Sequence, residues 1–301
     1  MPDPGHEGAQ DASQLHHPVL LAEVLQHLRL SPGARVLDCT LGLGGHAEAI
    51  LSAGGQVVGV DRDPRARALA STRLARFGDR FAATGGTYAE AVERCVAAGE
   101  RFAGVLADLG VSSLQLDDPS RGFGIAADAA ADMRMGEGCP ETALDLIDRL
   151  SEDELADVIY KYGEDRLSRR IARAIKRERE AGRIERAIDL AAVVRSAVPG
   201  HQPRHPALRT FQALRIVVND ELGQLTRLLA RLPDVLSPAG RAVVISFHSL
   251  EDRAVKESFR DTRRAGIYAD AARKVVTATD SELVTNRRSS SAKLRWAERA
   301  A

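Results

Sequence analysis

The chain has 301 residues, and its 42 Lys and Arg balance its 42 Asp and Glu, so the formal net charge is zero. This length allows one large domain or two and easily buries a hydrophobic core. Three cysteines with no C-x-x-C spacing imply neither a disulfide framework nor a zinc site. No apolar run approaches the roughly 20 residues that cross a bilayer, and the polar first residues lack the features of a signal peptide. We therefore expect a soluble cytoplasmic protein without a membrane partner.

The charges are unevenly distributed along the chain. Residues 1–160 carry 13 Lys and Arg against 25 Asp and Glu, whereas residues 161–301 carry 29 against 17. Such asymmetry favours a basic surface that faces a polyanion. Ordinary helix surfaces that happen to be rich in arginine are an equally good explanation.

The first predicted elements alternate in a regular way. Residues 1–14 predict a disordered lead-in, and residues 16–25 predict a helix. From residue 34 to 109 short apolar strands alternate with helical segments, which is typical of βαβ units and a parallel sheet.

A glycine-rich turn follows the first apolar strand, within residues 36–46. Gly42 and Gly44 permit positive φ and close approach of the backbone, and the helix that follows offers free N–H groups to an anionic ligand. Asp61 ends the next apolar run, where its carboxylate can accept both hydrogen bonds of a ribose diol. We therefore predict a site for a cofactor that contains a nucleoside.

Two classes of cofactor fit this pattern. Residues 42–47 satisfy the loose dinucleotide rule G-x-G-x-x-G/A, and Asp61 lies near the offset of about 20 residues expected for NAD. Asp38, just before the glycines, would repel phosphates but could hold the cationic amino-acid end of S-adenosylmethionine. Asp108 ends the strand predicted over residues 102–108 and adds a carboxylate at the same sheet edge. These acids favour S-adenosylmethionine, unless they only cap helices and turns.

Asp108 is the first candidate catalytic residue. The exocyclic nitrogen of a cytosine is a poor nucleophile, because its lone pair is delocalised into the ring. A carboxylate that accepts a hydrogen bond from this nitrogen, and later its proton, would favour attack on a methyl sulfonium. The alternative is an aspartate that caps the glycine turn after it.

The strand pattern stops at residue 117 and returns near residue 210. In between, the sequence predicts helices over 142–150, 151–162, 167–181 and 187–197. Afterwards it predicts one long helix over 211–232, a buried strand over 241–246, and an edge strand over 291–297 that pairs with 274–279 or 283–284. The simplest architecture is one α/β sheet built from residues 15–116 and 210–301, with residues 117–209 inserted as a helical domain.

Residues 205–215 combine positive and aromatic side chains in one turn and helix. Arg209 and Arg215 could bind phosphates, and His205 or Phe211 could stack on a base. Equally, Phe211 could be a core residue and the arginines could be solvated.

A second polar cluster follows the strand predicted over 241–246. His248 lies close to Glu251 and Asp252, which gives a possible acid–base or base-recognition group, or an ordinary helix start. We predict no metal here, because the three residues fall on one short turn without a fourth ligand. Arg253 begins a basic stretch.

These motifs together resemble the bacterial small-subunit ribosomal RNA methyltransferase family of the MraW type, which methylates N4 of a cytidine in the decoding region. The resemblance covers nearly the whole chain. It rests on residues 16–21 (HHPVLL), 38–46 (DCTLGLGGH), 61–64 (DRDP), 108–117 (DLGVSSLQLD), 245–253 (ISFHSLEDR) and 291–295 (SAKLR).

The resemblance implies a class I methyltransferase sheet with an inserted helical, RNA-binding domain. It implies that Gly44, Gly45 and His46 hold the methionine end of S-adenosylmethionine and that Asp61 holds its ribose. Tyr88 would lie against the adenine, and Asp108 and Gln115 would complete the site. The residues assigned to RNA contact are Arg121, Arg134, His205, Arg209, Phe211, Arg215 and Arg253.

The resulting hypothesis is an enzyme that transfers a methyl group to 16S ribosomal RNA in the small subunit, not to DNA. Asp108 would hold the amine, and His248 would serve the chemistry or base recognition. One rival is a nicotinamide-dependent oxidoreductase, whose melting temperature NAD(H) rather than S-adenosylhomocysteine would raise. The other rival is a non-catalytic RNA-binding assembly factor, which would transfer no methyl group. Monomer and homodimer both stay open.

Overall fold

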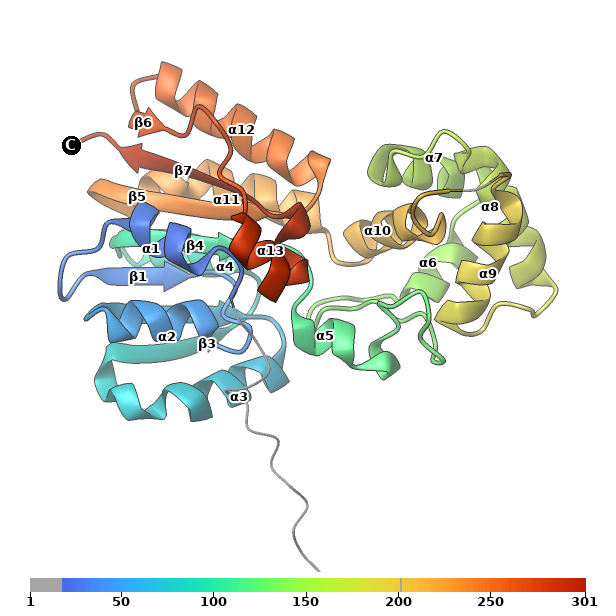
Figure 1. Ribbon diagram of the computed structural model, residues 1–301, viewed down its shortest axis with the longest axis horizontal. Coiled ribbons are helices and arrows are strands. Elements are labelled where there is room, and N and C mark those ends of the chain that lie inside the picture. Colours follow the sequence, from blue (N-terminus) through green and yellow to red (C-terminus); the bar gives the residue numbers. More distant parts are fainter. Residues whose placement is uncertain (1–17, 201) are drawn as a thin grey trace, which may run out of the picture.

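A computed structural model describes residues 18–200 and 202–301 and shows a sheet flanked by helices, with a separate helical part beside it (Figure 1). The predicted disordered segment 1–14, and His16 and His17 of the first motif, lie outside the described residues. None of the helices in the described ranges is long and apolar enough to cross a membrane.

The described residues form one seven-stranded sheet in the order β3-β2-β1-β4-β5-β7-β6. The first five strands pair in parallel, and β7 is antiparallel to both β5 and β6. This confirms the predicted α/β class with a Rossmann-like, mainly parallel sheet. The strands are β1 Arg35–Asp38, β2 Gln56–Asp61, β3 Phe81–Gly85, β4 Phe102–Asp108, β5 Leu236–Ser246, β6 Tyr268–Ala271 and β7 Lys293–Arg299.

Helices cover both faces of the sheet. Helices α1, α2 and α3 contribute to one hydrophobic cluster, and α4, α11 and α12 contribute to the cluster on the other face. Because the sheet is buried on both sides, its strands read as nearly continuous apolar runs. These helices span α1 Leu21–Leu28, α2 Gly45–Ser52, α3 Pro64–Leu74, α4 Tyr88–Ala97, α11 Glu221–Val235 and α12 Ser249–Arg264.

The last strand was predicted at an edge of the sheet, and this was wrong. Strand β7 lies between β5 and β6, and only one bridge, Val276 to Leu294, joins it to the predicted partner at 274–279. Residues 283–284 belong to helix α13 (Asp280–Thr285). The polar residues that suggested an edge find partners inside the fold: Arg295 donates to Asp252 of α12 at 2.7 Å.

The helical part has a hydrophobic cluster of its own, built from residues between Phe123 and Val218. All four predicted helices between residues 142 and 197 are present. Two of them begin with capping boxes, at Thr142 and Ser151, in which the side chain accepts a backbone N–H and the acid three residues later bonds back. The helices are α6 Ala143–Arg149, α7 Glu152–Gly163, α8 Ser168–Glu180, α9 Ala187–Ala197 and α10 Ala207–Val218.

The single helix predicted over 211–232 is two helices, α10 and α11, which break at Asn219 and Asp220. Asp220 adopts a left-handed backbone with φ 50°. The Asn219 side chain bonds the backbone of Met133 and Met135. Residues up to Val218 pack in the helical cluster, and Leu225 onward pack against the sheet. The division at residues 117 and 209 stays a prediction; the hydrophobic cluster of the helical part extends to Val218.

Phe211 was one candidate for stacking on a base, and its position rules out this role. Its side chain is 5% exposed and packs in the hydrophobic cluster of the helical part. The apolar periodicity of α10 therefore reflects core packing.

Replacing Phe211 with Ala should lower the free energy of unfolding by about 3–5 kcal/mol, because it leaves a cavity in a packed core. Phe211→Leu should cost clearly less. Urea unfolding followed by circular dichroism measures both changes. A Phe211→Ala variant of unchanged stability but impaired RNA binding would contradict the core assignment.

Candidate active site

A cavity of about 420 Å³ opens at the carboxyl ends of the parallel strands. Its wall combines the glycine turn, the ends of β2 and β4, the start of α11 and the C-terminal segment near Arg287. The cavity brings together eight residues that the sequence predicted for the site: Gly42, Gly45, His46, Asp61, Tyr88, Asp108, Gln115 and Arg215.

The glycine turn adopts the backbone that its sequence predicts. Gly42 and Gly44 have φ of 51° and 78°, and Gly44 directly precedes α2. A Cβ on Gly45 would lie 2.5 Å from Cγ of Pro18, so a side chain cannot fit there. The turn is tied to β2, because the N–H of Gly42 donates to Asp61 Oδ2 at 2.8 Å.

Asp61 keeps its carboxylate at the cavity wall. Its Oδ1 accepts the N–H of Asp63 at 2.9 Å, and burial raises its pKa above the usual value despite these two backbone bonds. Each carboxylate oxygen retains a lone pair for a hydroxyl donor.

Asp38, His46 and Asp108 form a polar trio beside the turn, in which Asp38 and His46 are buried and the side chain of Asp108 is 24% exposed. Asp38 Oδ1 accepts the N–H of Thr40 at 3.1 Å, and the Nε2 of His46 lies 3.6 Å from Asp108 Oδ2. Asp38 Oδ2, both ring nitrogens of His46 and Asp108 Oδ1 have no hydrogen-bond partner in the described part of the chain. Burial, with Asp108 and Asp61 nearby, raises the pKa of Asp38 to about 6.

These orphaned atoms fit the methionine end of S-adenosylmethionine. A buried polar atom without a partner costs about 1–3 kcal/mol, and a carboxylate is satisfied best by a cationic donor. The ammonium of an amino acid supplies such a donor for Asp38. Two phosphates would instead add charge of the same sign to that of the trio.

The predicted adenine contact, Tyr88, begins α4 and borders the same cavity. Its hydroxyl donates to the carbonyl of Glu221 at 3.2 Å, and burial raises the pKa of Tyr88 well above its usual range. The hydroxyl therefore stays protonated, and its hydrogen bond holds the ring between the end of β3 and the start of α11. This suits a flat aromatic ligand.

Gln115 lines the cavity but uses its amide inside the protein. Its Nε2 donates to the carbonyl of Met135 at 2.9 Å, and its Oε1 accepts the N–H of Ser112 at 2.9 Å. The side chain thus fixes helix α5 (Ser113–Asp117) to the loop that leads into the helical part.

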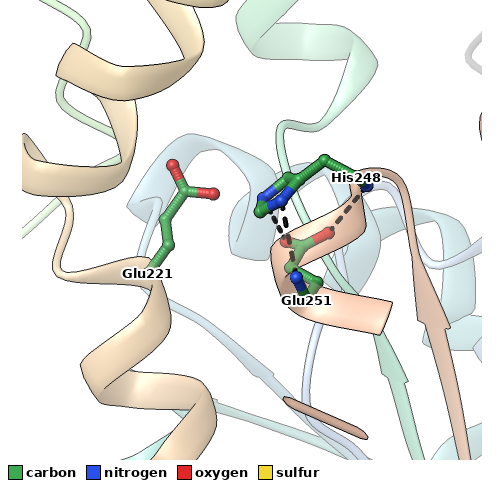
Figure 2. A group of neighbouring side chains, drawn as sticks. All are labelled: Glu221, His248 and Glu251. Carbon is green, nitrogen blue, oxygen red and sulfur yellow. Dashed lines mark hydrogen bonds and ion pairs between the residues drawn. The ribbon is translucent and has the colours of Figure 1, made fainter. Parts of the chain in front are cut away.

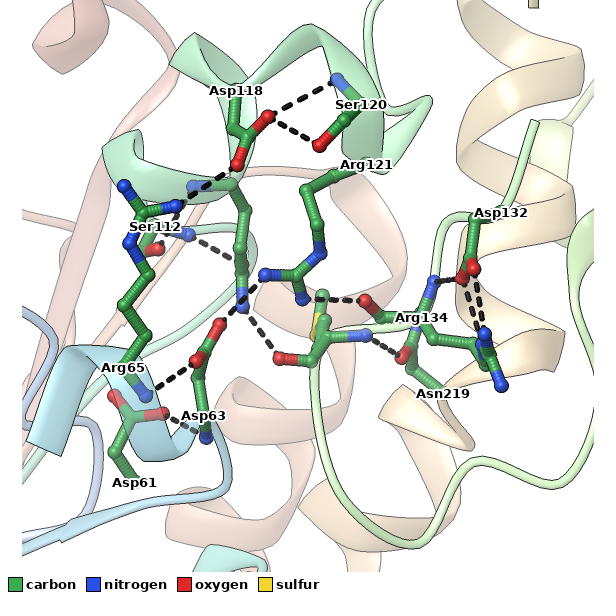
Figure 3. Close-up of polar contacts among 12 residues, drawn as sticks. Asp61, Asp63, Arg65, Ser112, Asp118, Ser120, Arg121, Asp132, Arg134 and Asn219 are labelled. Atoms are coloured by element: carbon green, nitrogen blue, oxygen red, sulfur yellow. Dashed lines mark hydrogen bonds and ion pairs between the residues drawn. The ribbon is translucent and has the colours of Figure 1, made fainter. Parts of the chain in front are cut away.

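A polar seam joins that loop to the sheet (Figure 3). Arg121 donates to Asp63 Oδ2 at 2.9 Å and to the carbonyl of Arg134 at 2.8 Å. Asp63 is 3% exposed and needs a cation, so Arg121 has an internal partner where we predicted contact with RNA. Arg134 pairs with Asp132 but is 42% exposed, and its RNA contact stays a prediction.

A second buried cluster contains Arg215, Glu221, His248 and Glu251; Figure 2 draws the last three. Arg215 donates to both carboxylate oxygens of Glu221, at 2.7 and 2.9 Å. It is therefore committed to an internal pair, where we predicted phosphate binding. Burial raises the pKa of Glu251, but its hydrogen bond to His248 and the charge of Arg215 outweigh this and leave the pKa below its usual value.

His248 caps helix α12, with its Nδ1 accepting the N–H of Glu251 at 3.5 Å and its Nε2 lying 3.3 Å from Glu251 Oε1. Among the described residues its neighbour Phe247 lines the cavity, and His248 does not. Its catalytic role stays a prediction. Ligand atoms of Glu221, His248 and Glu251 lie within 4.8 Å of one another. Arg215 already neutralises the charge of the Glu221 carboxylate in this group. The expectation that no metal binds here stays a prediction.

The remaining RNA candidates lie near the surface. His205 accepts the N–H of Ala207 at 3.2 Å, so it caps the start of α10. Arg209 and Arg253 are exposed, and both contact Glu164. Sequence reasoning missed Glu164, and it missed Glu221 because the Asn-Asp pair before it was read as the interior of one helix.

Fold and cavity together define a class I S-adenosylmethionine-dependent methyltransferase. Its parallel sheet carries the glycine turn, a carboxylate at the end of β2 and another at the end of β4, all at one edge.

The chain belongs to the MraW methylase family, whose model matches residues 13–300. Proteins named "Ribosomal RNA small subunit methyltransferase H" are close relatives. The one from Sorangium cellulosum is 48% identical and covers 99% of this chain and 93% of its own. The one from a Synechococcus strain is 50% identical and covers 95% of this chain and 98% of its own. The solved structure of an rRNA methylase from Streptococcus thermophilus aligns with 94% of this chain and 93% of its own, at 11% identity and a TM-score of 0.42. This likeness is too weak to bear on fold or function.

Cofactor binding should depend on pH through Asp38. With a pKa of about 6, Asp38 is protonated in the free protein at lower pH, and a bound ammonium favours the ionised form. S-adenosylhomocysteine should therefore bind more tightly as the pH rises from about 5 to about 7. Isothermal titration calorimetry at several pH values measures this slope.

Asp38→Asn is the matched variant. The native state holds the Asp38 proton more tightly than the unfolded chain, so stability of the free protein falls as pH rises from about 4 to about 6. The variant should melt at a higher temperature than wild type at pH 7 without ligand, and should bind S-adenosylhomocysteine weakly with a flat pH profile. A slope that persists in the variant would contradict the role of Asp38.

Proposed function

We propose that the protein methylates N4 of a cytidine in the decoding region of 16S ribosomal RNA, within the small ribosomal subunit. Membership of the family and the name shared by its relatives support the substrate. The observation that carries the chemistry is Asp108, whose buried Oδ1 has no partner in the described ranges and lies in the cavity wall at the end of β4. This substrate would place the protein in the cytoplasm.

The cofactor would lie along the sheet edge. Asp38, Gly44, Gly45 and His46 would hold the amino-acid end, supported by the orphaned atoms of the trio. Asp61 would accept the ribose hydroxyls, and Tyr88 would lie against the adenine, while Gln115 would keep the facing loop in place.

Bound S-adenosylmethionine supplies a methyl group on a sulfonium sulfur, and the sulfur keeps the bonding electron pair when the group leaves. Asp108 would accept a hydrogen bond from N4 of the cytosine, which raises the electron density on that nitrogen. As the bond from N4 to the methyl carbon forms, N4 loses a proton, and Asp108 is placed to take it. The cytosine would leave its stack to reach this position, and residues 117–209 would contact the surrounding RNA.

Replacing Asp108 with Asn or Ala should lower kcat about 100- to 10,000-fold, because each variant removes the acceptor for the N4 proton. Binding of S-adenosylhomocysteine should weaken far less than kcat. Asp157→Asn, on the exposed surface of α7, is the control for a lost carboxylate. Full activity of both Asp108 variants would contradict the assignment.

Transfer of labelled methyl groups from S-adenosylmethionine tests the function itself. Small subunits that lack the modification should accept label into 16S ribosomal RNA, and fully modified subunits should not. No transfer despite tight binding of S-adenosylhomocysteine would instead support a non-catalytic assembly factor.

A further inference from the structure

Glu164, which directly follows helix α7, contacts the sheet part. Its carboxylate accepts a hydrogen bond from the hydroxyl of Ser249, the first residue of α12, and pairs with Arg253 Nη2 at 3.3 Å. Arg209 of α10 donates to the backbone carbonyl of Glu164 at 3.3 Å. One glutamate of the helical part therefore meets a hydroxyl and two guanidinium groups from two other helices.

The groups around Glu164 are those that bind a phosphate. Arginine forks, a hydroxyl and the positive end of a helix dipole are the usual ligands of a phosphodiester. The pair is open to solvent, with side-chain exposures of 58% for Arg253 and 43% for Glu164. An exposed ion pair of this kind contributes little stability, so another anion can replace it.

The backbone holds Glu164 at this place against its own preference. Glu164 has φ 50°, in the left-handed region that non-glycine residues rarely adopt. Gly163 before it has no room for a side chain, since a Cβ would lie 2.7 Å from the carbonyl oxygen of Arg209. This contact fixes the Gly163–Glu164 corner between α10 and α12.

The location suits the backbone of the substrate. Ser249 follows Phe247, which lines the cavity wall, by two residues. A nucleotide whose base enters the cavity must leave its phosphates outside it, and Ser249 follows a residue of the cavity wall closely in the chain.

We propose that Ser249, Arg253 and Arg209 form a subsite for an RNA phosphate and that Glu164 occupies it until the substrate arrives. The proposal rests on the proposed function, because it takes RNA as the ligand. Glu164 thus acts as an internal competitor, which a phosphodiester of the bound RNA displaces from Arg253 and Ser249.

The test compares two substitutions that each remove one negative charge from the same helical part. Glu164→Gln removes the competitor. Glu152→Gln breaks the exposed pair between Glu152 and Arg173, which joins α7 to α8 away from α12. Affinity for unmodified small subunits, with S-adenosylhomocysteine present, is measured by filter binding at several salt concentrations.

Glu164→Gln should bind about threefold more tightly than Glu152→Gln, since both variants share the change in net charge and only one frees the subsite. Arg253→Ala should weaken binding and reduce the salt slope by about one. In the double variant Glu164→Gln/Arg253→Ala, the gain in affinity for the small subunits should disappear.

Two results would overturn the proposal. If Glu164→Gln binds no more tightly than Glu152→Gln while the wild type methylates the subunits, Glu164 is only a link between the two parts, and the proposed function stands. If the wild type neither binds nor methylates the subunits, the proposed function fails, and the subsite fails with it.

Discussion

Burial of negative charge at one edge of the sheet is the constraint on which the rest of the structure depends. Asp38, Asp61 and Asp108 end three parallel strands, and burial raises the pKa of the first two. The backbone N–H groups of Gly42 and Asp63 satisfy Asp61, but Asp38 Oδ2 and Asp108 Oδ1 find no partner among the described residues. The free protein is thus destabilised at this edge, and we expect the ammonium of the cofactor to offset the cost at Asp38 and the amine of the substrate to offset the cost at Asp108. Tight packing on both faces of the sheet keeps the carboxylates in place.

Two sets of polar contacts attach the helical part to the sheet part. The seam through Arg121 and Asn219 fixes the loop before it to the end of β2 and to the break between α10 and α11. On the opposite side, Glu164 reaches α12. These attachments differ in strength, because Asp63 and Asn219 are buried whereas Glu164 and Arg253 are exposed. The buried seam suits a fixed wall of the cavity, and the exposed pair suits a contact that the substrate can replace.

Much of this could be predicted from the sequence. Strand ends and the glycine turn are local features, so residues 36–46, Asp61 and Asp108 predicted the cavity and its cofactor class. Pairing between distant segments could not be predicted. The charged residues of β7 suggested an edge, because Asp252, the partner of Arg295, lies on a helix 43 residues away in sequence. Arg121 and Arg215 were assigned to RNA for the same reason, because their partners Asp63 and Glu221 become close only in the fold.

The identity of the methylated nucleoside tests the central claim most directly. Small subunits that lack the modification are incubated with the protein and S-adenosylmethionine, and the nucleosides of the 16S ribosomal RNA are separated and identified by mass fragmentation. The account predicts one new nucleoside, a cytidine with its methyl group on the exocyclic nitrogen. A methyl group on a ring carbon or on the ribose would contradict the role of Asp108 as the acceptor for an amine.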